Sequence, residues 1–478
     1  MKSYQQYING EFRDAVSKEQ FEVINPFTEK VVAMAPKGNA EDAALALEAA
    51  SAAQKAWAAK PCSERAVYLT KMAEAIRANR VMLAETLAEE QAKVMPLAQV
   101  EIDATAAYFD YYAGWSNKYE GEVIQSDRPT ENILLYHQPI GVVVGICPWN
   151  FPFFVMARKV APSILTGCTI ILKPSSDTPN TTFEFAKLIA DIGLPKGVLN
   201  FVSGGGSTLG DALVRSPEVG LITLTGSVET GQRIISATAE NITKTSLELG
   251  GKAPVIVCSD CDMDLTVKAV VASRVIFSGQ VCNCAERVYV EAPVYDEFME
   301  RMTKAMSDVT YGDPFAKTAP DMSSQINAAQ LDKIAAMVDK AKAEGAEVLV
   351  GGKRAENQPS GYFYEPTLLA GCTQDMEIIR KEIFGPALPV VKVDGFDEAI
   401  ELSNDCEYGL TSSIFTSNMN KMMRAINELK FGETYVNREH FEAIQGFHAG
   451  WRKSGIGGAD GKHGLYEYLQ THVAYIQY

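Results

Sequence analysis

The segment GVVVGI, residues 141–146, opens a series of short β-branched runs that decides the fold of this chain. Three similar runs follow it: TIILK (169–173), VLNFV (198–202) and GLITLT (220–225). Helix-like segments separate them at 152–166, 181–192, 207–215 and 229–238. Strands that alternate with helices at this spacing predict a parallel sheet of βαβ units. Because ligands of such sheets bind beyond the carboxyl ends of the strands, we expect the functional residues in the loops there.

A second α/β block is predicted from about residue 250 onward. Its expected strands include APVIV (253–257), ERVYVE (286–291), ALPVVKV (387–393) and LTSSIFT (410–416), with helices at 293–308, 329–344, 396–404 and 418–429. Residues 1–35 are typical of two hairpins, and residues 40–120 of amphipathic helices without chemistry. Residues 121–140 are predicted to be an extended arm, and the alternating tail YLQTHVAYIQY an edge strand.

Composition limits the classes of function. The 478 residues carry a net charge of −16 and no basic cluster, so neither nucleic acid nor an anionic membrane is an expected partner. No run of about 18 apolar residues exists, and the first residues lack the apolar core of a signal peptide. Nine cysteines without regular spacing favour a reducing, cytoplasmic location over a disulfide framework.

One cysteine stands out among the nine. Cys282 lies in FSGQVCNCAER (277–287), in a glycine-containing turn just after a predicted helix. A buried, inert core cysteine is the common alternative for any single cysteine. Cys282 and Cys284 lack a second ligand pair, so no metal site is predicted. No histidine falls in a local cysteine–histidine signature, and the CxxC of Cys258 and Cys261 is interpreted as structural.

Further candidates lie in loops after predicted strands. Three glycine-rich turns, at 203–210, 225–231 and 247–252, allow backbone N–H groups to approach a phosphate. Each taken singly is also an ordinary structural turn, and the GxGxxG fingerprint is absent. Glu248 is a candidate general base, and the amide of Asn150 a candidate donor to an oxyanion.

With these residues in view, the chain resembles the aldehyde dehydrogenase superfamily over essentially its whole length. CPWNFP, LKPS, TGS, LELGGK, FxxxGQxC, EIFGP and KSGIGG occur in the family's order. The resemblance implies an α/β protein with a Rossmann-type dinucleotide-binding domain (1–120 and 141–249) and an α/β catalytic domain (250–450). It also implies a small β oligomerisation arm formed by 121–140 and 451–478.

The resemblance assigns roles to matching positions. It implies that Cys282 is the nucleophile, that Asn150 helps to bind the oxyanion, and that Glu248 activates the water that hydrolyses a thioester. The residues implied for binding NAD or NADP are Ile146, Pro148, Trp149, Lys173, Ser175, Ser176, Gly206, Gly210, Thr225, Gly226, Ser227, Leu249, Glu382 and Phe384. Many members that prefer NAD carry glutamate where this chain has Ser176, so NADP is expected to be accepted.

The expected substrate is a small polar aldehyde such as lactaldehyde or glycolaldehyde. Arg158, Asn283, His448 and Phe151 occupy positions that line the substrate pocket in the family. A dehydrogenase of short carboxy-aldehydes such as succinate semialdehyde, with a preference for NADP, is the nearest alternative. A cysteine hydrolase or thioesterase and a binding protein that kept the fold are more distant ones, because neither needs a dinucleotide cradle. A homodimer or homotetramer is also expected.

Overall fold

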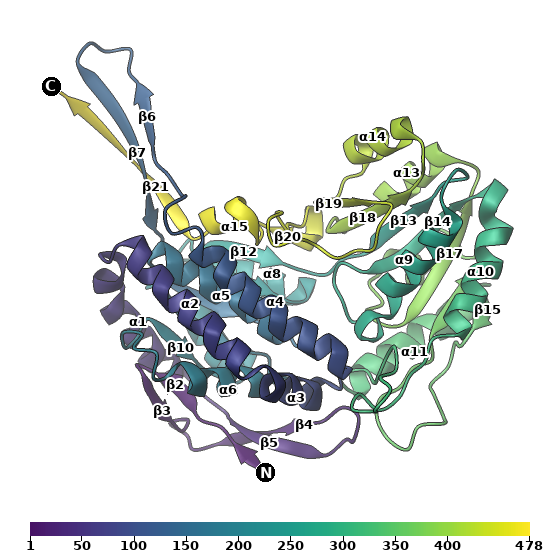
Figure 1. The fold of residues 1–478 in the computed structure, drawn as a ribbon, viewed down its shortest axis with the longest axis horizontal. Coiled ribbons are helices and arrows are strands. Elements are labelled where there is room, and N and C mark those ends of the chain that lie inside the picture. The colour runs from purple at the N-terminus through teal and green to yellow at the C-terminus, as the bar shows by residue number, and fades with distance from the viewer.

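The computed structural model describes residues 1–478, which form two α/β bodies and a protruding arm. Figure 1 shows the first body below the arm, and the second body on the opposite side of the molecule. The predicted α/β class is confirmed. No helix has both the length and the apolar character needed to cross a membrane.

The first body is built on an eight-stranded sheet in the order β20-β12-β11-β8-β9-β10-β2-β3. The five strands from β12 to β10 are parallel, as the alternation of strands and helices predicted. The strands of this sheet are β2 (Gln6–Ile8), β3 (Glu11–Arg13), β8 (Val142–Ile146), β9 (Thr169–Lys173), β10 (Leu199–Phe201), β11 (Val219–Thr225), β12 (Lys244–Glu248) and β20 (Gly455–Ile456).

Helices cover this sheet and bury two separate apolar clusters, one of 44 residues and one of 20. The helices are α1 (Ala40–Ala58), α2 (Cys62–Ala78), α3 (Arg80–Gln91), α4 (Met95–Ala113), α5 (Pro152–Thr166), α6 (Asn180–Ile189), α7 (Asp211–Val214), α8 (Val228–Thr238) and α15 (Gly461–Tyr466). Tyr108 and Tyr112 on α4 are fully buried. Their hydroxyls donate to Asp460 and to the Gly461 carbonyl, which ties α4 to the C-terminal segment.

Both predicted N-terminal hairpins are present. Asn9 and Gly10 connect β2 to β3 with φ of 56° and 75°, which a type I′ turn requires at both central positions. The second hairpin joins β4 (Gln20–Ile24) to β5 (Val31–Pro36), and β1 (Lys2–Ser3) completes a separate three-stranded sheet.

The second body contains a seven-stranded sheet in the order β15-β16-β17-β14-β13-β18-β19. All its strands are parallel except β15 at one edge. The strands are β13 (Ala253–Val257), β14 (Ala285–Glu291), β15 (Glu347–Val350), β16 (Thr367–Ala370), β17 (Ala387–Val393), β18 (Thr411–Phe415) and β19 (Glu433–Val436). The helices are α9 (Met263–Val275), α10 (Tyr295–Ser307), α11 (Ala328–Ala343), α12 (Glu377–Arg380), α13 (Phe396–Asn404) and α14 (Met419–Glu428).

The arm is an antiparallel sheet of β6 (Glu122–Gln125), β7 (Glu131–Pro139) and β21 (Leu469–Gln477), in the order β21-β7-β6. It projects away from both bodies (Figure 1), and β21 is an edge strand as predicted. The segment 451–478 does not all belong to the arm, because β20 pairs with β12 and α15 contacts α5. The loop between these elements therefore brings Asp460 to the first body.

Candidate active site

A cavity of about 540 Å³ lies at the carboxyl ends of β8, β9, β11 and β12. This is where a parallel sheet binds its ligands. Every residue that the sequence assigned to the cofactor lines it, and so do Asn150 and Cys282. Eleven further residues line the cavity, which are Cys147, Asp177, Asp211, Val214, Leu224, Thr230, Arg233, Ile234, Gly250, Gln330 and Lys333.

One end of the cavity has the character of a site for a dinucleotide. Ser227 caps the N-terminus of α8 by accepting a hydrogen bond from the Thr230 N–H, and the positive end of that helix dipole favours a diphosphate. A Cβ atom at Gly206 would have no heavy atom within 4 Å, so the backbone there is open to an incoming group. Lys173 adds a cation to the same wall. The volume, the cation and the helix end together fit NAD or NADP.

The two residues that bear on cofactor choice lie at this end. Ser176 and Asp177 both line the cavity. The Asp177 carboxylate contacts the Ser175 hydroxyl at 3.4 Å, and the Asp177 N–H donates to that hydroxyl at 3.3 Å. Ser176 is uncharged where many members that prefer NAD carry glutamate, but the neighbouring Asp177 keeps a negative charge close to that position.

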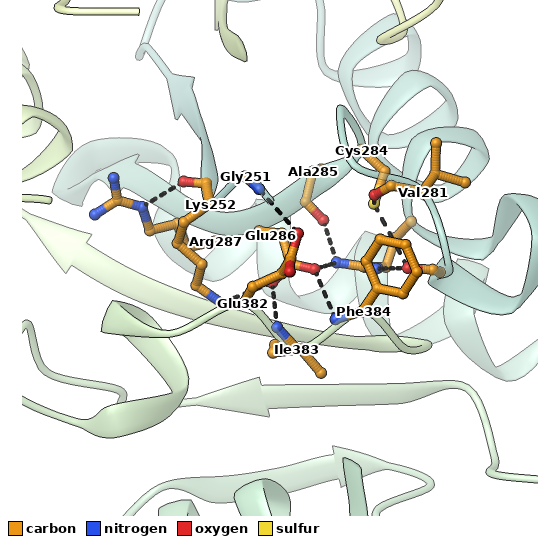
Figure 2. Close-up of polar contacts among 12 residues, drawn as sticks. Gly251, Lys252, Val281, Cys284, Ala285, Glu286, Arg287, Glu382, Ile383 and Phe384 are labelled. Carbon is orange, nitrogen blue, oxygen red and sulfur yellow. Dashed lines mark hydrogen bonds and ion pairs between the residues drawn. The ribbon is translucent and has the colours of Figure 1, made fainter. Parts of the chain in front are cut away.

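Glu382 and Phe384 form the opposite wall, and a buried charge cluster holds them in place. Figure 2 shows Glu286 at the centre of this cluster, where it accepts hydrogen bonds from the N–H groups of Ile383 (2.9 Å) and Phe384 (3.1 Å). Burial alone would raise the pKa of Glu286, but Lys252 and Arg274 lower it to about 2. The carboxylate is thus fixed in its charged form and anchors the Glu382–Phe384 loop.

Glu382 itself accepts a hydrogen bond from the Gly251 N–H at 2.8 Å (Figure 2). Burial, together with the nearby charge of Glu286, raises the pKa of Glu382 to about 7. A Cβ atom at Gly250 would lie 2.7 Å from Glu382 Oε2, so only glycine allows this close approach. The Glu382 carboxyl group is thus held in the cavity wall, and it ionises near neutral pH.

The nucleophile loop follows α9 through an unusual backbone. Phe277 and Ser278 have φ of 45° and 56°, in the left-handed region that residues with a side chain rarely adopt. The Gly279 carbonyl accepts a hydrogen bond from Arg274 at 2.6 Å, which links the loop to the cluster around Glu286. This path turns Cys282 toward the cavity.

The two thiols of this loop differ in their surroundings. Cys284 is buried, its thiol donates to the Val281 carbonyl at 2.9 Å, and burial raises its pKa to about 12. Cys282 is partly exposed and lines the cavity. Reactive cysteines are found in accessible positions, so Cys282 rather than Cys284 can meet a substrate.

Asn150 reaches the nucleophile loop from the opposite side. It lies in the loop between β8 and α5, and its Nδ2 donates to the Gln280 carbonyl at 3.0 Å. An amide nitrogen carries two hydrogens, so one remains for an oxyanion. Asn150 and Cys282 are therefore neighbours on one wall, as an oxyanion site requires.

Glu248 does not itself line the cofactor cavity, but it is hydrogen-bonded to Thr225, which does. Its Oε2 accepts a hydrogen bond from the Thr225 hydroxyl at 3.2 Å and lies 3.9 Å from Arg158 Nη1. Lys159 donates to the same hydroxyl at 3.1 Å. Glu248 is buried at the end of β12.

Arg158 is neither a surface charge nor a free donor for a substrate. It is buried, and its guanidinium donates to both oxygens of Asp460, at 3.1 Å and 2.6 Å, and to Glu442 at 2.7 Å. Asn283 donates to the other oxygen of Glu442 at 2.5 Å. The carboxylates occupy Nε and Nη2 of Arg158 and leave Nη1 beside Glu248, so at most Nη1 is available to a substrate.

His448 lies beside Cys282, which no local sequence signature indicated. Its Nδ1 contacts Glu433 at 2.6 Å, and its ring lies close enough to the Cys282 side chain to be influenced by it. Burial alone would lower the pKa of His448, but Glu433 and the Cys282 contact raise it well above the usual range. The raised pKa favours the protonated form of His448 beside Cys282.

None of the four residues that the resemblance assigns to the substrate (Arg158, Asn283, His448 and Phe151) lines this cavity. Phe151 packs against the loop that carries Cys282. Its ring packs edge-to-face on Phe277 with centroids 6.0 Å apart, in a small apolar cluster behind Cys282. Sequence reasoning also missed Glu433, Glu442 and Asp460. These three carboxylates come from the last tenth of the chain and carry no local motif.

Comparisons with known proteins agree with this arrangement. Residues 12–474 match the model of the aldehyde dehydrogenase family. The chain is 54% identical to lactaldehyde dehydrogenase of Escherichia coli (strain K12) over 98% of both chains. It is 38% identical to the D-glyceraldehyde dehydrogenase (NADP(+)) of Picrophilus torridus, over 99% of this chain and 96% of that one. The crystal structure of lactaldehyde dehydrogenase from Escherichia coli superposes with a TM-score of 0.98 and 53% identity, covering 100% of this chain and 99% of that one. The chain therefore belongs to the aldehyde dehydrogenase family.

Proposed function

We propose that this protein oxidises short hydroxy-aldehydes to carboxylic acids with NAD or NADP, through a covalent intermediate on Cys282. The observation that carries the proposal is the cavity itself. One wall holds Cys282 and Asn150, and the remaining walls hold every residue assigned to a dinucleotide. A hydrolase or a thioesterase needs no such cradle.

Cys282, Asn150 and Glu248 have different roles in the proposed reaction. The Cys282 sulfur attacks the aldehyde carbon, and the carbonyl oxygen becomes an oxyanion that the Asn150 amide and the Cys282 N–H stabilise. The bound cofactor supplies the acceptor for the hydride that leaves this carbon. Cys282 then carries a thioester. Glu248 takes a proton from a water molecule, which attacks the thioester carbon, and the acid leaves as the C–S bond breaks.

The charges near Cys282 favour a neutral substrate. Four carboxyl groups (Glu248, Glu433, Glu442 and Asp460) surround the cations Arg158 and His448. An incoming carboxylate would add a negative charge to a cluster that is already negative. A hydroxyl group can instead donate to Glu442 or accept from Arg158 Nη1 without adding charge.

The names of the relatives support the same class of substrate. Lactaldehyde and D-glyceraldehyde, which name two of them, are short aldehydes that bear hydroxyl groups. A carboxy-aldehyde such as succinate semialdehyde is the competing substrate, and the charge balance opposes it.

A substrate panel tests the proposal. We expect higher kcat/KM for lactaldehyde, glycolaldehyde and glyceraldehyde than for succinate semialdehyde or hexanal, measured with NAD and with NADP. Cys282→Ala should abolish turnover while cofactor binding persists. A higher efficiency with the carboxy-aldehyde or the alkyl aldehyde would contradict the substrate assignment. Turnover in the Cys282→Ala variant would remove the mechanism.

The same proposal includes a cytoplasmic homo-oligomer. All nine cysteines are free, which suits a reducing compartment and keeps Cys282 available. The arm exposes Val123, Tyr475, Ile476 and Tyr478 on a sheet with an unpaired edge at β21. Such an edge is normally covered by another chain. Light scattering at micromolar concentration should give a dimer or a tetramer, and a monomer would contradict the proposal.

A further inference from the structure

Lys93 and Glu101 form an ion pair in the helical layer beneath the active site. Lys93 follows α3, Glu101 lies on α4, and neither side chain has any exposed surface. Charges without contact to water are expensive unless each has several partners. This helical region carries no motif that would assign chemistry to it, so the reason for the pair is sought in its contacts.

The first set of contacts is to the loop that carries Asn150. Lys93 Nζ donates to the Asn150 backbone carbonyl at 2.7 Å, and Gln91 Nε2 donates to the same oxygen at 3.0 Å. Gln91 also donates to the carbonyl of Trp149. These hydrogen bonds therefore fix the backbone of Asn150, to which its side-chain amide is attached.

Glu101 holds the next part of the same loop. Its Oε1 accepts hydrogen bonds from the N–H groups of Phe153 at 3.0 Å and Phe154 at 3.2 Å, in the first turn of α5. These are N–H groups that a helix leaves without partners inside the helix. Lys93 and Glu101 together therefore fix both ends of the segment between Asn150 and α5.

The second set of contacts is to the nucleophile loop. Lys93 Nζ lies 3.7 Å from the ring centroid of Phe151 and 4.4 Å from that of Phe277. A cation over an aromatic face is attracted to it, more strongly where water is excluded. Phe277 begins the left-handed segment that leads to Cys282. The Lys93 ammonium group therefore contacts both the loop that carries Asn150 and the loop that leads to Cys282. The geometry of the oxyanion site depends on the relative position of these two loops.

We propose that Lys93, together with Gln91, is a positioning residue that sets the Asn150 amide relative to Cys282. The inference rests on the proposed role of Asn150 as oxyanion donor. Oxyanion stabilisation is sensitive to small displacements of the donor. Lys93 positions the donor through its hydrogen bond to the backbone carbonyl of Asn150. It contacts the loop that carries Cys282 through the Phe277 ring.

A double-mutant cycle with Asn150→Ala tests the positioning role. The variant K93M with E101Q removes the buried pair without leaving an unpaired carboxylate. We expect kcat/KM for the aldehyde to fall by about tenfold to a hundredfold, with cofactor affinity changed by less than about threefold. In the Asn150→Ala background the same pair of changes should cost less than about threefold, because the donor that Lys93 positions is already absent.

Arg65→Met is the matched control. Arg65 is also buried in this helical layer, but it donates to the Leu165 carbonyl at the far end of α5. Its loss should lower stability and change kcat/KM by the same factor with and without Asn150. If the Lys93 variant behaves like this control, its role is structural and the inference is wrong.

Two further results keep the test decisive. Should K93M with E101Q fail to fold, Gln91→Leu removes the second donor to the Asn150 carbonyl without disturbing an ion pair. It should show the same coupling to Asn150, with a smaller loss, and independent effects would overturn the inference. If Asn150→Ala alone leaves kcat/KM unchanged, the proposed role of Asn150 fails, which this cycle distinguishes from a failure of Lys93 alone.

Discussion

Cofactor binding should weaken as pH falls through neutrality, because Glu382 has a raised pKa. Its carboxylate is enclosed in the cavity wall beside the charged Glu286, and these two effects raise its pKa to about 7. The Gly251 N–H and Lys333 act in the opposite direction. We expect the hydroxyl groups of the nicotinamide ribose to donate to the ionised carboxylate.

The size of the effect follows from the fraction of Glu382 that is ionised. With a pKa of about 7, roughly a tenth of the groups are ionised one pH unit below it, and roughly nine tenths one unit above. If only the ionised form accepts both hydroxyls, Kd for the cofactor should be about tenfold larger at about pH 6 than at about pH 8.

Stability should change in the matching direction. An acid with a raised pKa keeps its proton longer in the folded state than in the unfolded state, so the contribution of Glu382 to the stability of the cofactor-free protein falls as pH rises from about 4.5 to about 7, and it is isolated by comparison with Glu382→Gln. The cofactor binds the ionised form, so the increase in Tm that it causes should grow with pH over the upper part of this window.

Equilibrium titration without aldehyde measures this dependence directly. The control is Glu382→Gln, in which an amide oxygen can still accept from the Gly251 N–H but no proton titrates. At about pH 8 the variant should bind the cofactor more weakly than the parent protein. Its own Kd should be nearly constant between about pH 6 and about pH 8. If the variant retains the tenfold change, another group is responsible. A constant Kd in the parent protein would refute the reasoning.

Three further substitutions have defined outcomes. Glu248→Gln should slow steady-state turnover by about a hundredfold or more, with a burst of reduced cofactor measured by stopped flow; unchanged turnover would rule out its role as base. Ser176→Glu should lower kcat/KM with NADP relative to NAD, since a second carboxylate would join Asp177 near the adenosine ribose, and an unmoved ratio would show that Ser176 is not the selector. Gly250→Ala should raise the cofactor Kd with little change in fold by circular dichroism, because its Cβ would lie 2.7 Å from Glu382 Oε2; an unchanged Kd would contradict the role given to that contact.

Much of the fold could be predicted because local sequence carries the signals that set it. Four β-branched runs between 141 and 225 became the parallel strands β8 to β11, and the Asn9-Gly10 turn became a hairpin. The strand β16 (TLLA, 367–370) was missed, because it is short, buried and poor in β-branched residues. The β2–β3 hairpin joins the far edge of the first sheet, and such pairing depends on the tertiary arrangement rather than on local pattern.

The cofactor residues could be predicted for a related reason. Most of them lie in turns directly after strands, and parallel strands bring those turns to one edge of the sheet. The residues behind the reacting groups have no such marker. Lys93 directly follows one amphipathic helix and Glu101 lies on the next, and only the packing of α3 and α4 under the Asn150 loop gives them partners.

Arg158 shows why the preference for a substrate could be stated only in part. The sequence placed a cation at a pocket position, and a cation alone favours a carboxylate as readily as a hydroxyl. The partners that decide between them lie 302 residues away at Asp460 and 284 residues away at Glu442. Once both carboxylates are bound to Arg158, the site no longer offers an unpaired positive charge. The substrate that suits it is one whose oxygen hydrogen-bonds without bringing a charge of its own.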